Sequence, residues 1–313
     1  MTPLVSLIVP IYHVRDFIGQ CARSVFSQTW KDMEFIFIDD CSNDGSLEIL
    51  ESVIDNEFPS LRERIRIVRN ERNLGIAAVR EIGLDLAEGD YVAHVDSDDW
   101  VEPDMIEKMV HTATETGSDL VYCDLFKNYE KRSTKILKEA EYDDVRILIK
   151  DLTLGRKFHG YLCNKLVHKS LYKKQDIARP AANAREDVVY VSQWAWFAKK
   201  ITHLPIPLYH YRKDNGGSML HRGKKAFSHD GALNQLAVFD FYRHKTFENP
   251  VGIIRDTFLL QTGRYMINSK DKELIDSRRD VLALVKKIPF GFKNGMRADR
   301  QIKLKLSISR LGI

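Results

Sequence analysis

Residues 91–99 read Tyr-Val-Ala-His-Val-Asp-Ser-Asp-Asp, a mostly apolar run that ends in three carboxylates within four positions. The apolar, β-forming residues at its start predict a strand that delivers Asp96, Asp98 and Asp99 to its carboxyl end. Carboxylates packed this closely resist ionising together unless a cation lies among them. Their hard oxygens suit Mg2+ or Mn2+ rather than Zn2+. The alternative is a polar turn in which Asp99 caps the helix that Pro103 opens.

The composition is that of an ordinary globular protein, with 44% hydrophobic and 29% charged residues among 313. This length fits one large domain or two smaller ones. The four cysteines lack paired spacing, which argues against a zinc site or a disulfide framework and favours a reducing cytoplasm. We expect no signal peptide and no membrane-spanning segment, since no apolar run approaches the ~20 residues that a bilayer requires. The net charge of +4 is too small to indicate nucleic-acid binding.

Short apolar runs alternate with helical patterns along the first 125 residues. Strands are predicted at residues 4–10, 34–38, 65–69, 91–95 and 120–125, with helices between them, one of them capped by Asp44. This alternation predicts right-handed βαβ units and a mostly parallel sheet. Ligands of such sheets bind beyond the carboxyl ends of the strands, where Asp39, Asp40 and the 96–99 cluster are expected. The convergence favours a binding site over a helix cap.

The pattern after residue 125 is less regular. Residues 127–150 are highly charged and predict strand fragments and an amphipathic helix. Glu186 and Asp187 open a helix, where acidic residues also favour the helix dipole without any site role. Residues 204–211 predict an edge strand, because two prolines exclude a central one. The polar loop at 212–218 that follows carries an arginine and a serine; it is either a surface turn or a segment that folds over phosphates.

The last third is predicted to be helical and carries much of the positive charge. Residues 302–311 alternate apolar residues with Lys303, Lys305 and Arg310, and this two-residue period favours a strand over an amphipathic helix. Further basic residues precede this tail: Lys286, Lys287, Lys293, Arg297 and Arg300. The region is either a surface that contacts an anionic membrane or a solvated helical appendage.

Several of these motifs together resemble family 2 glycosyltransferases of the GT-A fold. The matching stretches are residues 6–12, 38–46, 89–99, 164–166, 186–187 and 207–218, in that order. The resemblance covers roughly residues 4–220. It implies a GT-A type α/β fold, with a Rossmann-like mostly parallel sheet flanked by helices and a helical C-terminal extension. The expected domains are a catalytic domain at residues 1–222 and a mainly helical basic region at residues 223–313.

The resemblance implies a nucleotide pocket. Pro10 and Tyr12 would line it, and Asp40 would accept a hydrogen bond from the base, with Asp39 beside it. Arg80 stands where the family often has Arg-Asn, with Glu81 in place of the asparagine, and is expected near the ribose or the sugar.

The resemblance also implies the reacting groups. Asp96, Ser97 and Asp98 form the D-X-D motif, with Asp96 near the ribose and Asp98 binding the Mn2+ or Mg2+ ion that bridges the diphosphate. Asp187 would be the catalytic base, supported by Glu186. The diphosphate contacts are expected from Arg212 and Ser218, with His210. The Gln/Arg-X-X-Arg-Trp motif of processive members is absent, which indicates addition of a single sugar.

The chemistry agrees with this assignment. A nucleoside diphosphate leaves the anomeric carbon, so a divalent cation should neutralise the developing charge. The attacking sugar hydroxyl must lose its proton to a nearby base. Attack opposite the leaving group inverts the anomeric centre. The implied reaction moves one sugar from a nucleotide-diphosphate sugar, expected to be a UDP-sugar, to a glycan or lipid-linked oligosaccharide. Bacterial surface polysaccharide synthesis, in the cytoplasm or at the inner face of the plasma membrane, is the implied setting.

Other classes fit less well. A nucleotidyltransferase would normally show a glycine-rich, basic phosphate loop after the first strand, where residues 10–13 read Pro-Ile-Tyr-His. A dehydrogenase would show G-X-G-X-X-G there. A non-catalytic sugar-nucleotide-binding scaffold would keep the fold but lose the base or the metal ligand, and both Asp187 and Asp98 are present.

Overall fold

The computed structural model describes residues 2–130, 132–174, 177–213, 224–243, 251–288, 298–311 and 313. The chain forms two compact units that alternate along the sequence. The first comprises Met1–Glu141, Tyr161–Ile177 and Phe197–Gly217, and the second comprises Tyr142–Gly160, Ala178–Trp196 and Ser218–Ile313. The domain boundary predicted from the sequence lies after residue 222. In the structure, the segments Tyr142–Gly160 and Ala178–Trp196 belong to the same unit as the C-terminal helices.

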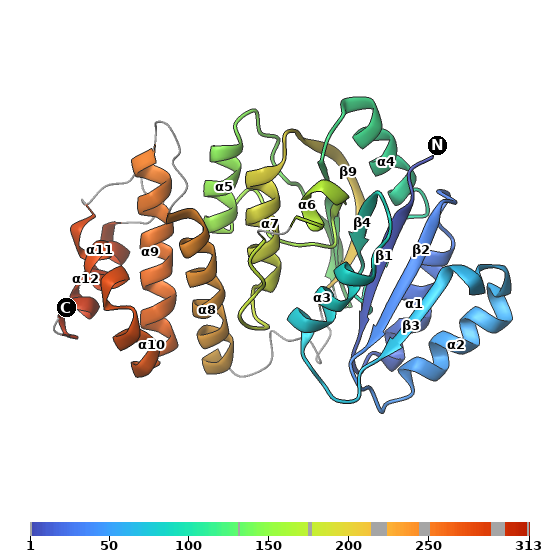
Figure 1. Cartoon of the computed structure of the whole chain (residues 1–313), viewed down its shortest axis with the longest axis horizontal. Helices are drawn as coiled ribbons and strands as arrows, with labels where there is room; N and C mark the ends of the chain where they lie inside the picture. The colour runs from blue at the N-terminus through green and yellow to red at the C-terminus, as the bar shows by residue number, and fades with distance from the viewer. Residues whose placement is uncertain are drawn as a thin grey trace. The chain divides into compact units, whose positions relative to one another are not determined.

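A single sheet organises the first unit (Figure 1). Among the described residues its strands are β1 (Val5–Ile11), β2 (Met33–Asp39), β3 (Ile65–Arg69), β4 (Tyr91–His94), β5 (Trp100–Val101), β6 (Leu120–Tyr129), β7 (Arg132–Leu137), β8 (Lys165–His168) and β9 (Ile201–Arg212). Their order is β3-β2-β1-β4-β8-β6-β9-β5, and β7 pairs with β6.

The strand directions bring several carboxyl ends to one edge of this sheet. β1 runs parallel to β2 and β4, β2 runs parallel to β3, and β6 runs parallel to β9. β8 is antiparallel to both β4 and β6, so these two strands share a direction. β1, β2, β4, β6 and β9 therefore all end at the same edge. The predicted α/β class with a Rossmann-like, mostly parallel sheet is confirmed.

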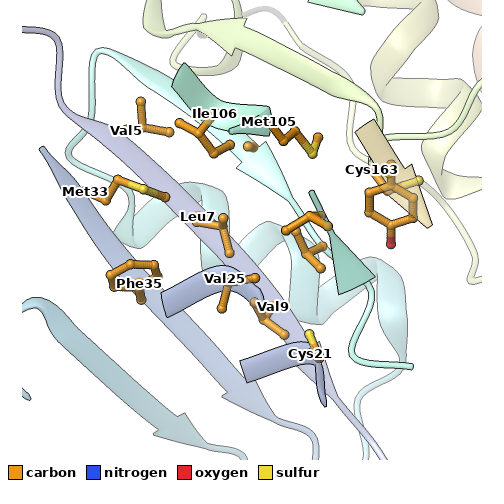
Figure 2. Close-up of a cluster of buried hydrophobic side chains, with 14 of the residues drawn as sticks. Val5, Leu7, Val9, Cys21, Val25, Met33, Phe35, Met105, Ile106 and Cys163 are labelled. Atoms are coloured by element: carbon orange, nitrogen blue, oxygen red, sulfur yellow. The ribbon is translucent and has the colours of Figure 1, made fainter. Parts of the chain in front are cut away.

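Helices cover both faces of the sheet. In the first unit they are α1 (Arg15–Phe26), α2 (Ser46–Glu57), α3 (Ile76–Leu86), α4 (Met105–Thr116) and the short α6 (Lys169–Tyr172), with a 3-10 helix at Pro59–Arg64. Val5, Leu7 and Val9 of β1 point to the face that α1 and α4 cover, where Val25 and Met105 complete a buried cluster (Figure 2). Alternation along the strand sends Ile8 to the opposite face.

Gly83 allows α3 to lie close on that opposite face. A Cβ atom at this position would lie 2.5 Å from Cγ2 of Ile8 and 3.1 Å from Cδ1 of Ile38. Only a residue without a side chain permits this approach of helix to sheet. The helix therefore presents Arg80, one turn earlier, to the carboxyl edge from a fixed position.

The predicted edge strand is an inner strand over part of its length. β9 pairs with β6 on one side, and Tyr209 and His210 also pair with the two-residue strand β5 on the other. Pro205 and Pro207 are tolerated because they precede the part that β5 covers. They also fall where the register between β6 and β9 shifts, after Cys123 and after Asp124.

The second unit is helical. Its helices are α5 (Val145–Leu154), α7 (Glu186–Phe197), α8 (Lys224–Arg243), α9 (Val251–Ser269), α10 (Lys272–Ser277), α11 (Arg279–Lys287) and α12 (Ala298–Ser309). α8 and α9 lie side by side (Figure 1). Close packing at Gly231, against Tyr265, and at Gly263, against Val285, joins α9 to its neighbours.

The C-terminal tail is a helix, so the strand that the two-residue period favoured is wrong. Leu304 and Ile308 are buried, whereas Leu306 is 54% exposed. Residues four apart lie on the same face of a helix, so an alternating pattern of apolar residues also supplies a helical stripe. Among the described residues, no helix is both long enough and apolar enough to cross a bilayer.

Candidate active site

Asp39, Asp40 and the carboxylates of residues 96–99 lie at the carboxyl edge of the sheet in the first unit. Asp39 ends β2 and Asp40 follows it, while the 96–99 turn comes shortly after β4. Arg212 ends β9 at the same edge. These positions follow from the parallel register, because buried apolar runs form the strands and the polar residues come where each run stops.

Asp99 is bound by β9. The Tyr209 hydroxyl donates to Oδ2 of Asp99 at 2.7 Å, and the Arg212 amide donates to Oδ1 at 2.7 Å. Within the turn, the Asp99 amide donates to the Asp96 carbonyl at 3.0 Å. The side chain is buried, and α4 begins six residues later at Met105. The alternative in which Asp99 caps that helix is therefore wrong.

The turn concentrates negative charge. Burial raises the pKa of the Asp99 carboxyl well above its usual range, and the nearby carboxylates of Asp98 and Asp96 raise this pKa further. The hydrogen bonds from Arg212 and Tyr209 lower it and only partly compensate. A cation bound beside Asp98 would relieve this repulsion.

Asp96 is paired with Arg80. Nη2 of Arg80 lies 2.8 Å from Oδ1 of Asp96, and the Arg80 side chain is 8% exposed. Arg80, predicted near the ribose or the sugar, thus reaches the D-X-D turn from α3. Ser97 is buried, whereas Asp98 is partly exposed.

Arg212 connects three parts of the first unit. Its Nε donates to the Asp98 carbonyl at 2.8 Å, and its Nη2 donates to Oε1 of Gln20 at 2.7 Å. Its guanidinium lies 4.8 Å from the ring centres of both Phe17 and Trp100. The predicted diphosphate ligand therefore lies against the D-X-D turn and the first helix.

His210 is held beside the same edge. Its Nε2 lies 2.7 Å from Oε1 of Glu102. Its ring stacks on Trp100 at 4.7 Å and on Phe126 at 4.5 Å between centres. Ser218, the other predicted diphosphate ligand, lies outside the described residues.

Asp40 organises a loop. Its Oδ1 accepts hydrogen bonds from Nδ2 of Asn70 and from the Leu74 amide, and its Oδ2 accepts one from the Gly75 amide, each at 2.8 Å. These bonds fasten residues 70–75, which lead into α3. The predicted contact of Asp40 with the base stays a prediction, and the carboxylate has this structural task besides.

Asp39 stabilises the neighbouring turn. Its Oδ1 accepts from the Ser42 amide at 3.0 Å, and its Oδ2 lies 3.2 Å from Nε of Arg69. The hydroxyl of Ser42 in turn accepts from the His13 amide at 3.2 Å. The turns after β1 and β2 are thereby linked.

The first strand delivers the other two predicted pocket residues. Pro10 is buried within β1, and Tyr12 follows the strand with its side chain partly exposed. The Tyr12 ring stacks on His13 at 4.2 Å between centres, and His13 adopts a left-handed φ of 53°. An aromatic stack thus lies beside the carboxyl end of β1.

Glu186 and Asp187 belong to the second unit. They begin α7, as predicted, and Glu186 is buried. The Val188 amide donates to Oδ1 of Asp187 at 2.7 Å, so this carboxylate interacts with its own helix start. The preceding Arg185 has a left-handed φ of 66°, and its guanidinium lies 4.9 Å from the ring centre of Tyr265.

The donor set at the turn fits a hard divalent cation. Among the described residues, no three His, Cys, Asp or Glu side chains converge to form a complete metal cage. Mg2+ commonly takes only one or two protein carboxylates and completes its shell with substrate phosphates and water. Asp98, with Asp96 beside it, meets that requirement when a diphosphate supplies further oxygens.

Sequence reasoning missed Tyr209, Gln20 and Glu102. Tyr209 lies within an apolar strand pattern, where it is indistinguishable from a core aromatic residue. Residues 204–212 read as a strand that leads into a polar loop with an arginine, which indicates that the end of the strand lies near the site. The pattern does not indicate which side chain contacts the carboxylates.

Comparisons with known proteins agree on one family. The family model described as "Glycosyl transferase family 2" matches residues 6–175. The protein named "Putative glycosyltransferase EpsH" of Bacillus subtilis (strain 168) is 32% identical over 239 residues, which are 74% of this chain and 67% of EpsH.

Two solved structures share the fold. TarS 1–349 of S. aureus, in complex with UDP-GlcNAc, aligns with a TM-score of 0.68 at 20% identity, over 99% of this chain and 92% of that one. The mannosyltransferase PcManGT of Pyrobaculum calidifontis, in complex with GDP-Man and Mn2+, aligns with a TM-score of 0.57 at 15% identity, over 99% of this chain and 88% of that one.

Proposed function

Because the chain belongs to glycosyl transferase family 2, and is a glycosyltransferase with the GT-A fold, we propose that it transfers one sugar with inversion from a UDP-sugar. The acceptor is a hydroxyl of a glycan or lipid-linked oligosaccharide in bacterial surface polysaccharide synthesis. The observation that carries the proposal is the carboxylate turn at residues 96–99, which Tyr209, Arg212 and Arg80 hold at the carboxyl edge of the sheet.

Donor binding is assigned to the first unit. Asp98, with Asp96, would hold Mn2+ or Mg2+, which supplies charge neutralisation for the departing diphosphate. Arg212 would add a positive charge beside that leaving group, with His210 and Ser218 as further contacts. Pro10, Tyr12, Asp39 and Asp40 would surround the base, supported by the linked turns after β1 and β2.

Proton removal is assigned to Asp187. The acceptor hydroxyl must lose its proton as it attacks the anomeric carbon, and a carboxylate within hydrogen-bond reach can take it. The buried Glu186 beside it would support its position. This leaves the two acidic tasks of the reaction to separate residues, with Asp98 for the metal and Asp187 for the proton.

The activity is tested with a panel of UDP-sugars in the presence of Mn2+, comparing the wild-type protein with Asp98→Ala and Asp187→Asn. Asp98→Ala is expected to lose Mn2+-dependent UDP binding and turnover together. Asp187→Asn is expected to keep UDP binding and to lose about 10²–10⁴-fold in turnover, the usual contribution of a general base. Unchanged turnover in both variants would refute the assignment.

The product distinguishes the proposal from its alternatives. Transfer of a sugar from a UDP-sugar releases UDP, whereas a nucleotidyltransferase would release pyrophosphate when it joins UTP to a sugar 1-phosphate. A binding scaffold would take up the nucleotide sugar and release neither. Nucleotide chromatography with the UDP-sugar panel, and a pyrophosphate assay with UTP and sugar 1-phosphates, therefore decide among the three classes.

Membrane contact is proposed for the basic C-terminal region. Leu284 and Leu306 are 43% and 54% exposed, and exposed Lys287 and Lys303 share their helices. Cationic side chains beside exposed leucines favour an anionic lipid surface. We expect flotation with phosphatidylglycerol vesicles, none with phosphatidylcholine vesicles, and a marked loss in the Lys287→Gln/Lys303→Gln variant. Equal flotation of the variant would contradict the contact.

A further inference from the structure

Two lysines face each other across the β6–β7 hairpin. Lys127 of β6 and Lys135 of β7 are direct partners in the antiparallel register. On its other side, Lys127 is the register partner of Tyr211 in β9. Partners in adjacent strands point to the same face of a sheet, so Lys135, Lys127 and Tyr211 form one row across three strands.

A third lysine extends this row. Lys213 follows Tyr211 by two residues, and its Nζ lies 4.4 Å from the centre of the Tyr211 ring. Its backbone amide donates to the Asn128 carbonyl of β6 at 2.9 Å, which fixes it beside the hairpin. Partial burial lowers the pKa of the Lys213 ammonium, and the charge of Lys127 lowers it further. The two ammonium groups therefore share one electrostatic environment.

The row begins beside the carboxylate turn. β6 and β9 end at the edge where β4 delivers residues 96–99. The charge of Asp99 raises the pKa of both Tyr211 and Lys213. Neighbouring strands lie about 4.8 Å apart, so Lys135 lies roughly 10 Å from Tyr211. One diphosphate held at Asp98 would not cover this length.

Among the described residues, none of the three lysines forms a salt bridge, although the charge of Asp99 raises the pKa of Lys213. Like charges placed directly opposite one another in an antiparallel pair destabilise the sheet. The Tyr211 ring and the charge of Asp99 favour the Lys213 ammonium, whereas the facing ammonium groups of Lys127 and Lys135 repel each other. A bound anion would relieve that repulsion.

We propose that Lys127, Lys135 and Lys213 form an anion subsite that binds a phosphate group of the acceptor while the donor occupies the carboxylate turn. The inference rests on the proposed glycosyltransferase function and adds a substrate class to it, namely a phosphate-bearing acceptor. The phosphate belongs either to a lipid diphosphate or to a polymer with phosphodiester links. A row of ammonium groups can bind either kind of phosphate, because a lysine binds an anion through its charge and does not require a particular planar geometry.

The test compares Lys127→Gln/Lys135→Gln with wild-type protein and with Lys199→Gln. Lys199 is exposed and precedes β9 at the opposite edge of the same sheet, so it is a matched control. Calorimetry measures binding of farnesyl diphosphate and of a short glycerol phosphate oligomer, each with Mn2+ and saturating UDP present. Farnesol and glycerol are the uncharged references, and UDP binding alone is measured for every protein.

We expect wild-type protein and Lys199→Gln to bind at least one phosphate probe and neither uncharged reference. The double variant should bind that probe at least tenfold more weakly, keep its UDP affinity within twofold, and melt at an equal or higher temperature. Lys213→Gln alone should also weaken the binding of that probe. Which of the two probes binds identifies the source of the phosphate.

Three outcomes would overturn the subsite. Wild-type protein could bind neither probe, the double variant could bind as tightly as wild type, or it could lose UDP affinity by the same factor, which would assign the lysines to the donor. Absence of UDP binding in wild-type protein would instead refute the proposed function. The two failures are therefore distinguishable in one set of measurements.

Discussion

The Tyr209 hydroxyl donates a 2.7 Å hydrogen bond to Oδ2 of Asp99 and accepts one of 3.1 Å from the Asp96 amide. One side chain of β9 thereby fastens both ends of the turn that carries Asp98. The turn is consequently not a loose loop whose carboxylates find their places only when a metal arrives. Its geometry is set by the strand that pairs next to β6 in the second half of the sheet.

Replacing Tyr209 with phenylalanine should therefore affect metal use as well as stability. The variant leaves the buried Oδ2 of Asp99 and the Asp96 amide without this partner, which should cost about 1–3 kcal/mol of unfolding free energy. We expect a higher Mn2+ concentration for half-maximal activity, because Asp98 is less well positioned. Tyr122→Phe is the control, since the hydroxyl of Tyr122 donates to the Ala140 carbonyl and touches no carboxylate of the turn. An equal change in Mn2+ dependence in both variants would contradict the positioning role.

Replacing Asp40 with asparagine should loosen residues 70–75. An amide offers one acceptor oxygen where the carboxylate receives three hydrogen bonds, so at least one donor loses its partner. We expect faster hydrogen exchange at the Leu74 and Gly75 amides and a loss of about 1–3 kcal/mol in stability. Asp39→Asn should leave those two amides protected, because its bonds go to Ser42 and Arg69. Unchanged exchange in Asp40→Asn would show that other contacts hold the loop.

Replacing Gly83 with alanine should destabilise the packing of α3 on the sheet. The added Cβ would lie 2.5 Å from Cγ2 of Ile8, so helix or strand must move. Overpacking of this kind costs about 1–3 kcal/mol, which chemical denaturation can measure. Gly19→Ala in α1 is the matched control, because its Cβ would meet the exposed end of the Arg23 side chain at 3.2 Å, rather than a buried strand residue. The control should be neutral or stabilising by up to about 1 kcal/mol; a stable Gly83→Ala would mean that α3 does not approach so closely.

Thiol labelling should report on the nucleotide pocket. Cys21, Cys123 and Cys163 are buried, and burial raises the pKa of each thiol, to about 12 for Cys123. At pH 8 these three should stay protonated and inaccessible to iodoacetamide. Cys41, partly exposed directly after Asp40, should be the one labelled thiol in the native chain. We expect UDP with Mn2+ to slow the labelling of Cys41, and mass spectrometry would identify the labelled site. Labelling at another cysteine, or an equal rate with and without UDP, would contradict the prediction.

The framework of the first unit was predictable because parallel strands are buried on both faces. Such strands need continuous apolar runs, and the runs at β2 and β4 stop where the acidic residues begin. The convergence of Asp39, Asp40 and the 96–99 turn at one edge followed from direction alone. The motifs then indicated the family, which the comparisons confirm.

Other features depended on partners that no local pattern reveals. β8 contains a buried lysine, Lys165, whose Nζ donates to the Tyr161 carbonyl and to Oδ1 of Asn164, so a polar stretch forms an inner strand. The use of Asp40 by the amides of a distant loop is equally invisible in the sequence. Leu304 and Ile308 satisfy a strand period and a helix face alike, and packing decided for the helix.

The position of β9 has a consequence for shortened forms of the chain. The family match ends at residue 175, whereas β9 begins at Ile201 and lies between β6 and β5. A fragment ending near residue 175 would leave the side of β6 that pairs with β9 without a partner strand, and open strand edges of this kind recruit other chains. Such a fragment would carry the D-X-D residues and yet aggregate rather than fold.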